Sequence, residues 1–291
     1  MKSTCKLWFA TMVVVCLAVS VTNTWAQLTV TNNLVLWLKA DALSLTNGQA
    51  VSAWADSSTS GNNTSQGAIT NQPAFHTGLF NGLPGVTFDG NSDFLGLTRV
   101  SLPAGLTYFA VFRTTNTDAA SSYPLNAPLT IIGDHTDLIE NGFGLSGGHA
   151  QYNNFTGQNT RVTGTIALSD GAPHVIAVTH ATNAPGPANL YVNGLSDGSM
   201  NSSYRSTFVG FDRISGGANV SPCCTGTEDL FQGDLAEILV YNTVLTGAQR
   251  GDVYEYFVAK YALPEPGSVT LIVLALFALR TKLGRNPRSR G

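Results

Sequence analysis

The sequence is poor in the residues that build long helices and poor in positive charge. Charged residues make up 11% of the 291 residues, and lysine and glutamate are rare between residues 27 and 263. That stretch holds 17 Asp and Glu against 8 Lys and Arg, a net charge of −9, although the whole chain carries only −3. A nucleic-acid partner is therefore not expected. The abundant Gly, Asn, Ser and Thr disfavour long helices and suit short strands joined by turns.

Long apolar runs occur only near the two ends of the sequence. Two lysines precede an apolar run from Leu7 to Val21, and small residues on either side of Trp25 offer a cleavage site. This layout is typical of a secretion signal. We predict removal of residues 1–26, which leaves Gln27 as the new N-terminus. A lipoprotein signal acylated at Cys16 is the alternative, and it is disfavoured because the preceding valine is larger than such a site needs.

The second apolar run, residues 268–279, follows Pro264-Glu265-Pro266 and precedes a basic end, residues 280–291. Proline ends any preceding helix, so a new segment starts there. Twelve helical residues reach about 18 Å, short of the roughly 30 Å of a bilayer core. The run therefore predicts a short transmembrane segment with transient membrane contact, and the basic end places the folded domain outside the cytoplasm. An ordinary single-span tail anchor is the alternative.

This tail resembles the PEP-CTERM sorting signal of Gram-negative bacteria, with Pro264, Glu265 and Pro266 as the sorting motif. The resemblance implies a membrane-embedded exosortase as processing partner and delivery to the cell surface or an extracellular matrix. It covers the last 28 residues, in which the cations are separated by other residues and do not form one arginine block.

Residues 27–263 are predicted to form one all-β domain. β-branched and aromatic residues gather in short runs, and turn residues separate nearly all of them. The run from Thr107 to Arg113 is apolar on both sides, which is expected for a strand covered on both faces by a sandwich. The predicted strands are Leu34–Lys39, Ala50–Ala55, Gly85–Phe88, Thr107–Arg113, Leu129–Ile132, His174–Thr179, Ala188–Val192 and Leu235–Tyr241.

Two local signals stand out in this domain. Asn193-Gly194 follows a strand and supplies the two positive φ angles that a type I′ hairpin needs. Thr246 with Gln249 three residues later forms a capping box, which predicts the start of one C-terminal helix. The apolar stripe of that helix should pack on the sandwich; it consists of Val253, Tyr254, Phe257, Val258 and Tyr261.

Several phrases of the domain together resemble the concanavalin A-like, laminin-G-like jelly-roll domains of bacterial surface proteins. They are LVLWLKAD at 34–41, VSAWADSSTSGNN at 51–63, GVTFDGNSDFL at 85–95, APHVIAVTH at 172–180, LYVNG at 190–194 and GDLAEILVYNTVLT at 233–246. The resemblance implies two antiparallel sheets, one of them concave, with carbohydrate or protein ligands on the concave face or the loop rim. The ligand itself does not follow from it.

Catalytic patterns are absent or unspecific. Some enzymes of this fold carry Glu-x-Asp-x-x-Glu for paired-carboxylate chemistry, and this chain has no such spacing. Glu237 is predicted to be structural, since a catalytic role needs a partner from another strand. Ser146 and Ser196 stand in Gly-x-Ser-x-Gly-like patterns, but neither is followed by helix-forming residues as a nucleophile elbow requires. No residue is predicted to be catalytic.

Calcium is the ion best suited to the acidic loops of the domain, because its ligands are oxygens. Asp89, Asn91 and Asp93 alternate as in an ion-binding loop, although the glycine and the distal glutamate of an EF-hand are missing. Asp234, and Asp56 with Asn62, are further candidates. For each of them, turn capping or a solvated charge is the competing interpretation.

Two other loops hold residues with reactive or metal-binding side chains. Asp134, His135 and Asp137 are a weak transition-metal candidate. Cys223 and Cys224 are the cysteines left after signal removal, and an exported protein favours their oxidation to a vicinal disulfide. Pairing between chains and two plain thiols remain alternatives.

These observations predict an exported binding module at the cell surface or in an extracellular matrix. It is expected to recognise carbohydrate or a matrix polymer without catalysis. Two alternatives stay open: a polysaccharide hydrolase whose carboxylates come from separate strands, and a structural exopolymer protein that binds nothing specific.

Overall fold

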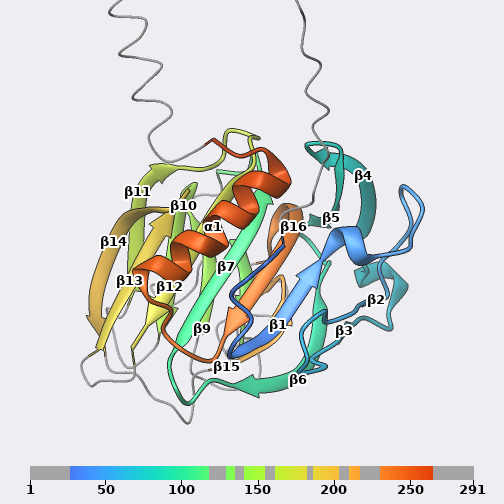
Figure 1. Ribbon diagram of the computed structural model, residues 1–291. Coiled ribbons are helices and arrows are strands. Elements are labelled where there is room, and N and C mark those ends of the chain that lie inside the picture. Colours follow the sequence, from blue (N-terminus) through green and yellow to red (C-terminus); the bar gives the residue numbers. More distant parts are fainter. Residues whose placement is uncertain are drawn as a thin grey trace, which may run out of the picture.

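The protein is a sandwich of two antiparallel β-sheets with one α-helix on its outside (Figure 1). The computed structural model describes residues 27–117, 129–134, 141–154, 161–181, 186–202, 210–216 and 230–264. The predicted all-β sandwich with one C-terminal helix is therefore confirmed. Within these ranges no helix is both long and apolar enough to cross a membrane. The predicted signal, residues 1–26, and the apolar segment 268–279 lie outside them.

The first sheet has the order β14-β13-β12-β7-β16-β5-β4, and β1 pairs with the C-terminal half of β16. The longest strand, β16, stands at its centre and contacts β5, β7 and β1. The bounds are β1 Leu34–Lys39, β4 Ala74–Phe80, β5 Leu83–Asp89, β7 Leu106–Arg113, β12 His174–His180, β13 Gly186–Val192, β14 Leu195–Ser202 and β16 Gln232–Tyr241.

The second sheet has the order β11-β10-β9-β8-β15-β6-β3-β2. Near one edge of the sandwich β11 contacts β13 and β14 of the first sheet, and Asp197 of β14 accepts hydrogen bonds from Thr165 of β11. The bounds are β2 Ala53–Trp54, β3 Thr64–Ser65, β6 Leu95–Ser101, β8 Leu129–Gly133, β9 Asn141–Ser146, β10 His149–Asn154, β11 Arg161–Ala167 and β15 Gly210–Ile214.

Two apolar cores divide the side chains of the first sheet. In β7, Tyr108, Ala110 and Phe112 point into the core between the sheets, whereas Phe109 and Val111 join a second cluster under the helix. Both faces of this strand are therefore buried. This arrangement explains why its sequence does not alternate between apolar and polar residues.

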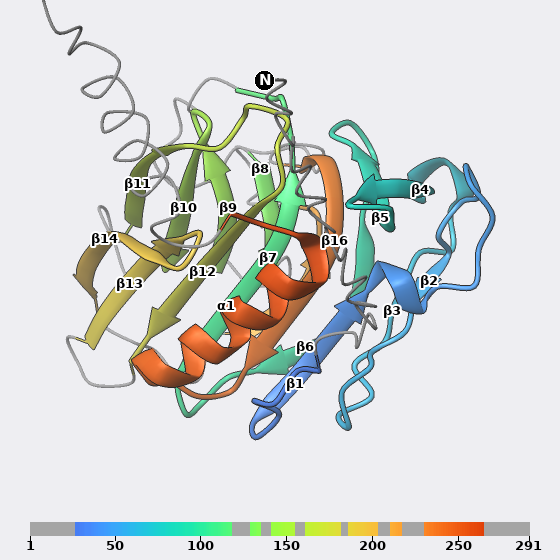
Figure 2. The same ribbon diagram turned by 45° about the horizontal axis from the view of Figure 1, so that its top comes forward.

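The helix α1, Gly247–Tyr261, packs on the outer face of the first sheet, over β7, β12 and β16 (Figures 1 and 2). The predicted capping box is present, because Thr246 Oγ1 accepts from the Gln249 amide and the Gln249 side chain accepts from Thr246 N. Of the predicted stripe, Val253, Tyr254, Phe257 and Tyr261 are buried and Val258 is partly buried. Two short 3-10 helices, Ala40–Ala42 and Ile69–Asn71, complete the described elements.

Local signals located most of the first sheet correctly. The β1 strand has the predicted bounds, and the Asn193-Gly194 hairpin between β13 and β14 is confirmed, with φ angles of 48° and 79°. The prediction Ala50–Ala55 shortens to the two residues of β2. Strands that the sequence analysis missed are rich in glycine and polar residues; they are β3, β4, β6, β9, β10, β11, β14 and β15.

Candidate functional site

The outer face of the second sheet is polar along β10. In this strand Ala150 and Tyr152 belong to the core between the sheets, so Gln151 and Asn153 point to the opposite face. Both side chains are nonetheless buried, with 2% and 5% of their surface exposed. Buried amides on the outside of a sheet are unusual because polar groups lose hydration there. This face is the strongest candidate for a binding site.

The strand register places these amides beside a strip without side chains. Gln151 is opposite Gly144 of β9 and Thr163 of β11, and Asn153 is opposite Gly142. Gly144 is in turn opposite Thr130 of β8. Residues directly opposite each other share a face of the sheet. Polar side chains therefore flank a strip formed by the two glycines of β9.

The space available for a Cβ atom differs between Gly144 and Gly142. A Cβ atom on Gly144 would lie 2.1 Å from the carbonyl oxygen of Leu129, beside the register shift between Thr130 and Ile132. That position excludes any side chain. A Cβ atom on Gly142 would be 3.7 Å or more from its nearest described neighbours, the side-chain atoms of Thr130, which is ordinary van der Waals contact, so these residues do not demand glycine there. A glycine inside a strand often marks a bulge, a bend, or a place where a ligand or another backbone segment approaches closely.

Gln151 presents a hydrogen-bond acceptor that has no partner within the described part of the chain. Its Nε2 donates to Thr163 Oγ1 at 2.8 Å, whereas its Oε1 is buried and accepts no hydrogen bond from a described residue. Leaving a buried acceptor unpaired costs about 1–3 kcal/mol. A ligand that donates a hydrogen bond to Oε1 would recover part of that free energy.

Asp134 directly follows β8 and is held by an arginine. Arg99 of β6 places its Nε at 2.8 Å and its Nη2 at 2.6 Å from Asp134 Oδ2, and the aspartate is fully buried. The transition-metal prediction for Asp134 needs His135 and Asp137, which lie outside the described residues. Within the described ranges, no three His, Cys, Asp or Glu side chains form a group that could hold a metal.

The predicted calcium loop is a tightly bonded turn. Asp89 Oδ1 accepts hydrogen bonds from the amides of Asn91, Ser92 and Asp93, and Asp93 Oδ2 accepts from the amide of Asp89. Burial alone would raise the pKa of Asp89, but these amide bonds outweigh it and lower that pKa. Burial raises the pKa of Asp93, and the charge of Asp89 adds to the increase. The carboxylates therefore already cap the turn, and calcium binding stays an untested prediction.

The other two calcium candidates also have protein partners. Asp56 accepts from the amides of Trp37, Ser58 and Asn62. Asp234 accepts from Thr87 Oγ1 at 2.5 Å and from Arg113 Nε at 2.6 Å. In the pairing of β16 with β5, Asp89 lies opposite Gln232. Asp234 is two residues further along β16, opposite Thr87. The candidates therefore form two local groups, Asp89 with Asn91 and Asp93 and Asp56 with Asn62, and Asp234 bonds residues outside both groups.

Glu237 is buried between the first sheet and α1. Its Oε1 accepts from Trp37 Nε1 at 2.5 Å and from the Tyr256 hydroxyl at 2.8 Å. Its Oε2 accepts from Lys260 Nζ at 2.8 Å and from the Tyr261 hydroxyl at 2.6 Å. Lys260 also bonds Asp41 at 3.0 Å. These four donors and a fully buried position make Glu237 a link between sheet and helix, in line with the structural role expected from the sequence.

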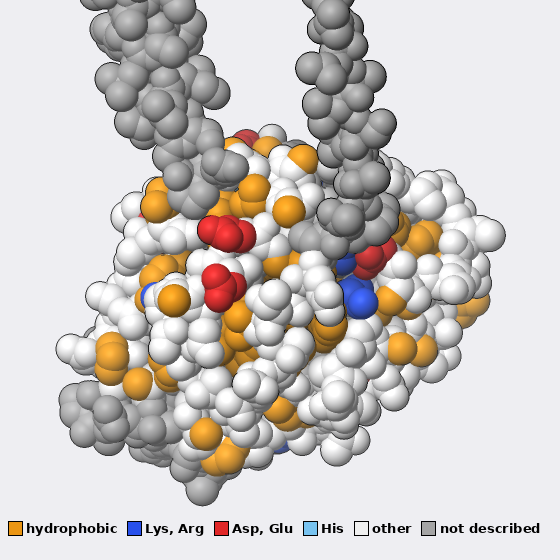
Figure 3. All heavy atoms as spheres, in the orientation of Figure 1, with side chains coloured by type: hydrophobic (Ala, Val, Ile, Leu, Met, Phe, Trp, Pro, Cys, Tyr) orange, Lys and Arg blue, Asp and Glu red, His pale blue; other side chains and the backbone are white. Residues whose placement is uncertain are grey.

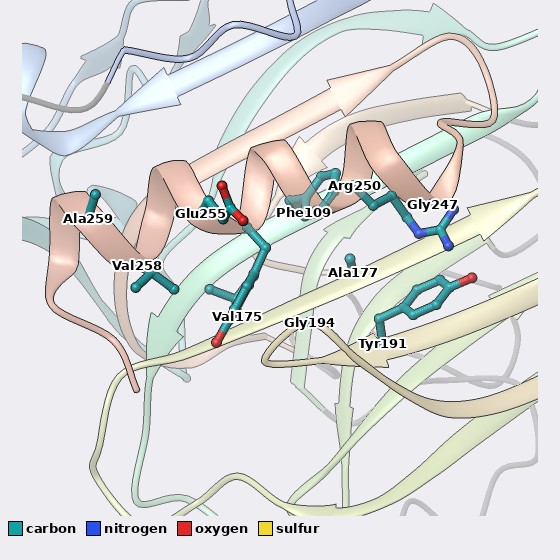
Figure 4. Close-up of a pocket in the computed structure, with 12 residues that line it drawn as sticks. Phe109, Val175, Ala177, Tyr191, Gly194, Gly247, Arg250, Glu255, Val258 and Ala259 are labelled. Carbon is teal, nitrogen blue, oxygen red and sulfur yellow. The ribbon is translucent and has the colours of Figure 1, made fainter. Parts of the chain in front are cut away.

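A groove of about 680 Å³ runs between α1 and the β12–β13 hairpin. Figure 4 shows Phe109, Val175 and Ala177 of the first sheet below the helix, with Val258 and Arg250 descending from α1. The remaining lining residues include three glycines. They are Tyr191, Gly194, Gly247, Gly251, Tyr254, Glu255 and Ala259.

The serine patterns do not form nucleophile elbows. Ser146 ends β9 and is followed by the Gly147-Gly148 turn into β10, and Ser196 lies in β14 just after the Asn193-Gly194 turn. Both serines therefore belong to β-hairpins, whereas an elbow requires a helix after the serine.

Aromatic side chains that could stack on a sugar, Trp37, Trp54 and Tyr152, have partners within the fold. Trp54 and Tyr152 are fully buried, and the Tyr152 hydroxyl lies 3.1 Å from His180 Nδ1 inside the sandwich. Trp37 donates to Glu237, and Lys39 covers its ring at 4.2 Å.

Some predicted site residues cannot be placed. Cys223 and Cys224 lie outside the described residues, and so do Glu265 and Pro266 of the predicted sorting motif. Pro264 is the last described residue, and its carbonyl accepts from the Tyr254 hydroxyl at 2.9 Å. The polar amides of β10 were missed by the sequence analysis. The alternation in HAQYNN was their signal, but polar residues in a short run do not indicate burial.

Comparison with known protein families gives one match, which covers more than half of the chain. The Laminin_G_3 family model, described as the concanavalin A-like lectin/glucanases superfamily, matches residues 89–249. These residues run from the last residue of β5 into α1. A search of curated proteins found no match.

Solved structures share the fold at low sequence identity. One is domain 4 of AbnA, a GH43 extracellular arabinanase from Geobacillus stearothermophilus, in complex with arabinotriose. It aligns with a TM-score of 0.51 and 14% sequence identity, and the alignment covers 76% of this chain and 98% of that domain. Two others are the binding domain of Paraclostridial Mosquitocidal Protein 1 and the botulinum neurotoxin type G receptor binding domain, each with TM-score 0.51 and 15% identity. The alignments cover 78% and 77% of this chain but 53% and 51% of those two structures.

Proposed function

The chain belongs to the concanavalin A-like lectin/glucanases superfamily, and on that premise we propose that its sandwich is a non-catalytic carbohydrate-binding module. The observation that carries the proposal is the likeness to the arabinanase domain. That domain is matched over 98% of its length, and its structure contains arabinotriose. At 14% identity the likeness concerns the fold, so the binding site has to be argued from the residues of this chain.

The glycan site we propose is the polar outer face of the second sheet. Sugar hydroxyls both donate and accept hydrogen bonds, and so do the amides of Gln151 and Asn153. The unpaired Oε1 of Gln151 offers an acceptor to a hydroxyl, and Gly142 has no side chain that would obstruct a sugar ring, although both residues are buried in this structure. The exposed Thr163 and Arg161 on β11 lie opposite Gln151 and Asn153, on the side of β10 away from the glycine strip. A polysaccharide hydrolase is less well supported, because Glu237 is enclosed by its own donors.

The test is a glycan array on the wild-type protein, on Gln151→Ala and on Thr98→Ala as the matched control. Thr98 is an exposed strand residue of the same sheet, on β6, far from β10 in the strand order. We expect binding in the wild type and in T98A, and at least a tenfold loss in Q151A. Equal binding by all three proteins would place the site elsewhere, and release of reducing ends from a bound glycan would favour the hydrolase.

We further propose that the module works outside the cell, at the surface or in an extracellular matrix. The supporting features are the secretion-type segment 1–26 and the tail that resembles a sorting signal processed by an exosortase. Expression in a Gram-negative host with such an enzyme, followed by intact mass, tests this proposal. A mass that begins at Gln27 and lacks the basic end is expected, and an unprocessed cytoplasmic protein would refute it.

A further inference from the structure

The groove beside α1 lies on the opposite side of the sandwich from the proposed glycan site. Its floor is formed by Phe109, Val175 and Ala177, and its helical wall uses residues at three- and four-residue steps from Gly247 to Ala259. Twelve steps along a helix are about 18 Å long. The groove is thus as long as a helix of about twelve residues, and its volume of about 680 Å³ lies in the range of ligand pockets.

The described chain ends beside this groove. After α1, Ala262 adopts a left-handed conformation with φ of 52°, which reverses the chain. The Pro264 carbonyl then accepts from the hydroxyl of Tyr254, a residue that lines the groove. Glu265, Pro266 and Gly267 follow, and after them the uncharged apolar segment 268–279 begins. An apolar segment of matching length is therefore tethered within a few residues of an apolar groove.

We propose that segment 268–279 docks in the groove beside α1 as long as it is not in a membrane. Docking would shield the apolar side chains of the tail from water, and the short tether raises the effective concentration of the tail at the groove. Arg250 does not oppose an apolar occupant, because its guanidinium donates to the Leu245 carbonyl and covers the Tyr191 ring at 4.3 Å. The groove thus serves as an internal holding site for the tail.

Charge complementarity supports the same occupant. The basic end of the chain, residues 280–291, directly follows the apolar segment and carries five Lys and Arg. The exposed side of α1 carries Asp252 and Glu255, and Figure 3 shows acidic side chains on this face of the molecule. With the apolar segment in the groove, the basic end is brought close to these carboxylates.

Gly251 gives a direct test of the groove. A Cβ atom on Gly251 meets no atom within 4 Å, and its φ is not in the left-handed region, so a side chain there extends into open space. Gly251→Trp is expected to fill the groove, and Gly251→Ala is the matched control that leaves it open. Ala259→Trp blocks the other end and provides a second variant if G251W does not fold. Denaturant unfolding of each variant checks its folding.

The measurement is hydrogen exchange, followed by mass spectrometry, on the full chain in dilute solution without detergent. We expect amides of 268–279 to exchange at least tenfold more slowly in the wild type and in G251A than in folded G251W or A259W. The blocked variants should also bind phospholipid vesicles several-fold more strongly, because their tail is released. Equal exchange of 268–279 in all folded variants would overturn the proposal, as would protection that appears only when vesicles are added.

Discussion

Replacing Glu237 by glutamine should weaken the attachment of α1 to the first sheet. Each carboxylate oxygen of Glu237 faces two donors: Trp37 and Tyr256 on Oε1, and Lys260 and Tyr261 on Oε2. In either orientation the amide NH₂ of glutamine faces one group that can only donate, the Trp37 indole or Lys260, and one tyrosine hydroxyl that can accept instead. At least one hydrogen bond is therefore lost, and the negative charge opposite Lys260 is lost as well.

The expected destabilisation follows from burial. Lys260 has 6% of its side chain exposed and keeps Asp41 at 3.0 Å as a second partner. Removing one partner of a buried ion pair typically costs about 3–5 kcal/mol. Because Asp41 compensates part of the lysine charge, we expect Glu237→Gln to lower the free energy of unfolding by about 3 kcal/mol.

Denaturant unfolding followed by tryptophan fluorescence measures this loss, since the indole of Trp37 is one of the four donors. Glu255→Gln is the matched control, because Glu255 is an exposed residue of the same helix. We expect E255Q to stay within about 0.5 kcal/mol of the wild type. A loss below about 1 kcal/mol in E237Q would refute the claim that this cluster holds the helix. In that case a double-mutant cycle that combines Glu237→Gln with Lys260→Met would give a coupling energy near zero.

Three further predictions concern pH, the helix cap and the acidic loop. Burial and the charge of Glu237 raise the pKa of Tyr256 and Tyr261 above 10. These tyrosines therefore stabilise the fold fully below pH about 10, and the free energy of unfolding should fall above it by about 1.4 kcal/mol per pH unit and tyrosine; a flat profile of denaturation midpoints from pH 9 to 11 would contradict this. Thr246→Ala removes the capping box and should cost about 1 kcal/mol, measured by thermal unfolding; no change would mean that packing alone fixes the helix start. Asp89→Ala removes an acceptor of three amides and should cost about 1–2 kcal/mol. An equal loss in calcium and in chelator supports a capped turn, whereas a larger loss in calcium supports the predicted ion site.

Features that depend only on neighbouring residues follow from the amino-acid sequence alone. The apolar and β-branched run Leu34–Lys39 forms β1 with the predicted bounds, because such residues favour extended backbone. Asn193-Gly194 makes its hairpin because both residues tolerate positive φ. The Thr246 and Gln249 box starts the helix because the two side chains satisfy free amides within one turn.

The positions of the buried polar groups depend on contacts between distant strands. Leu235 and Ile238 both face the core between the sheets, three residues apart, because a register shift in β16 inserts an extra residue between them. Without this shift Glu237 would share the side of Leu235; with it, Glu237 turns toward the helix. Its partner Trp37 is 200 residues away in the sequence. No local sequence pattern therefore predicts the hydrogen bond between them.

The two candidate sites could not be predicted from the sequence either, because both depend on contacts between distant segments. Gln151 becomes an outward and buried amide only when β10 pairs with β9 and β11 in the observed register. The groove exists only because α1 lies across β7, β12 and β13, with the end of the chain at its edge. Local propensity fixes which residues are extended or helical. Pairing between distant strands, driven by burial of the two cores, fixes which side chains meet.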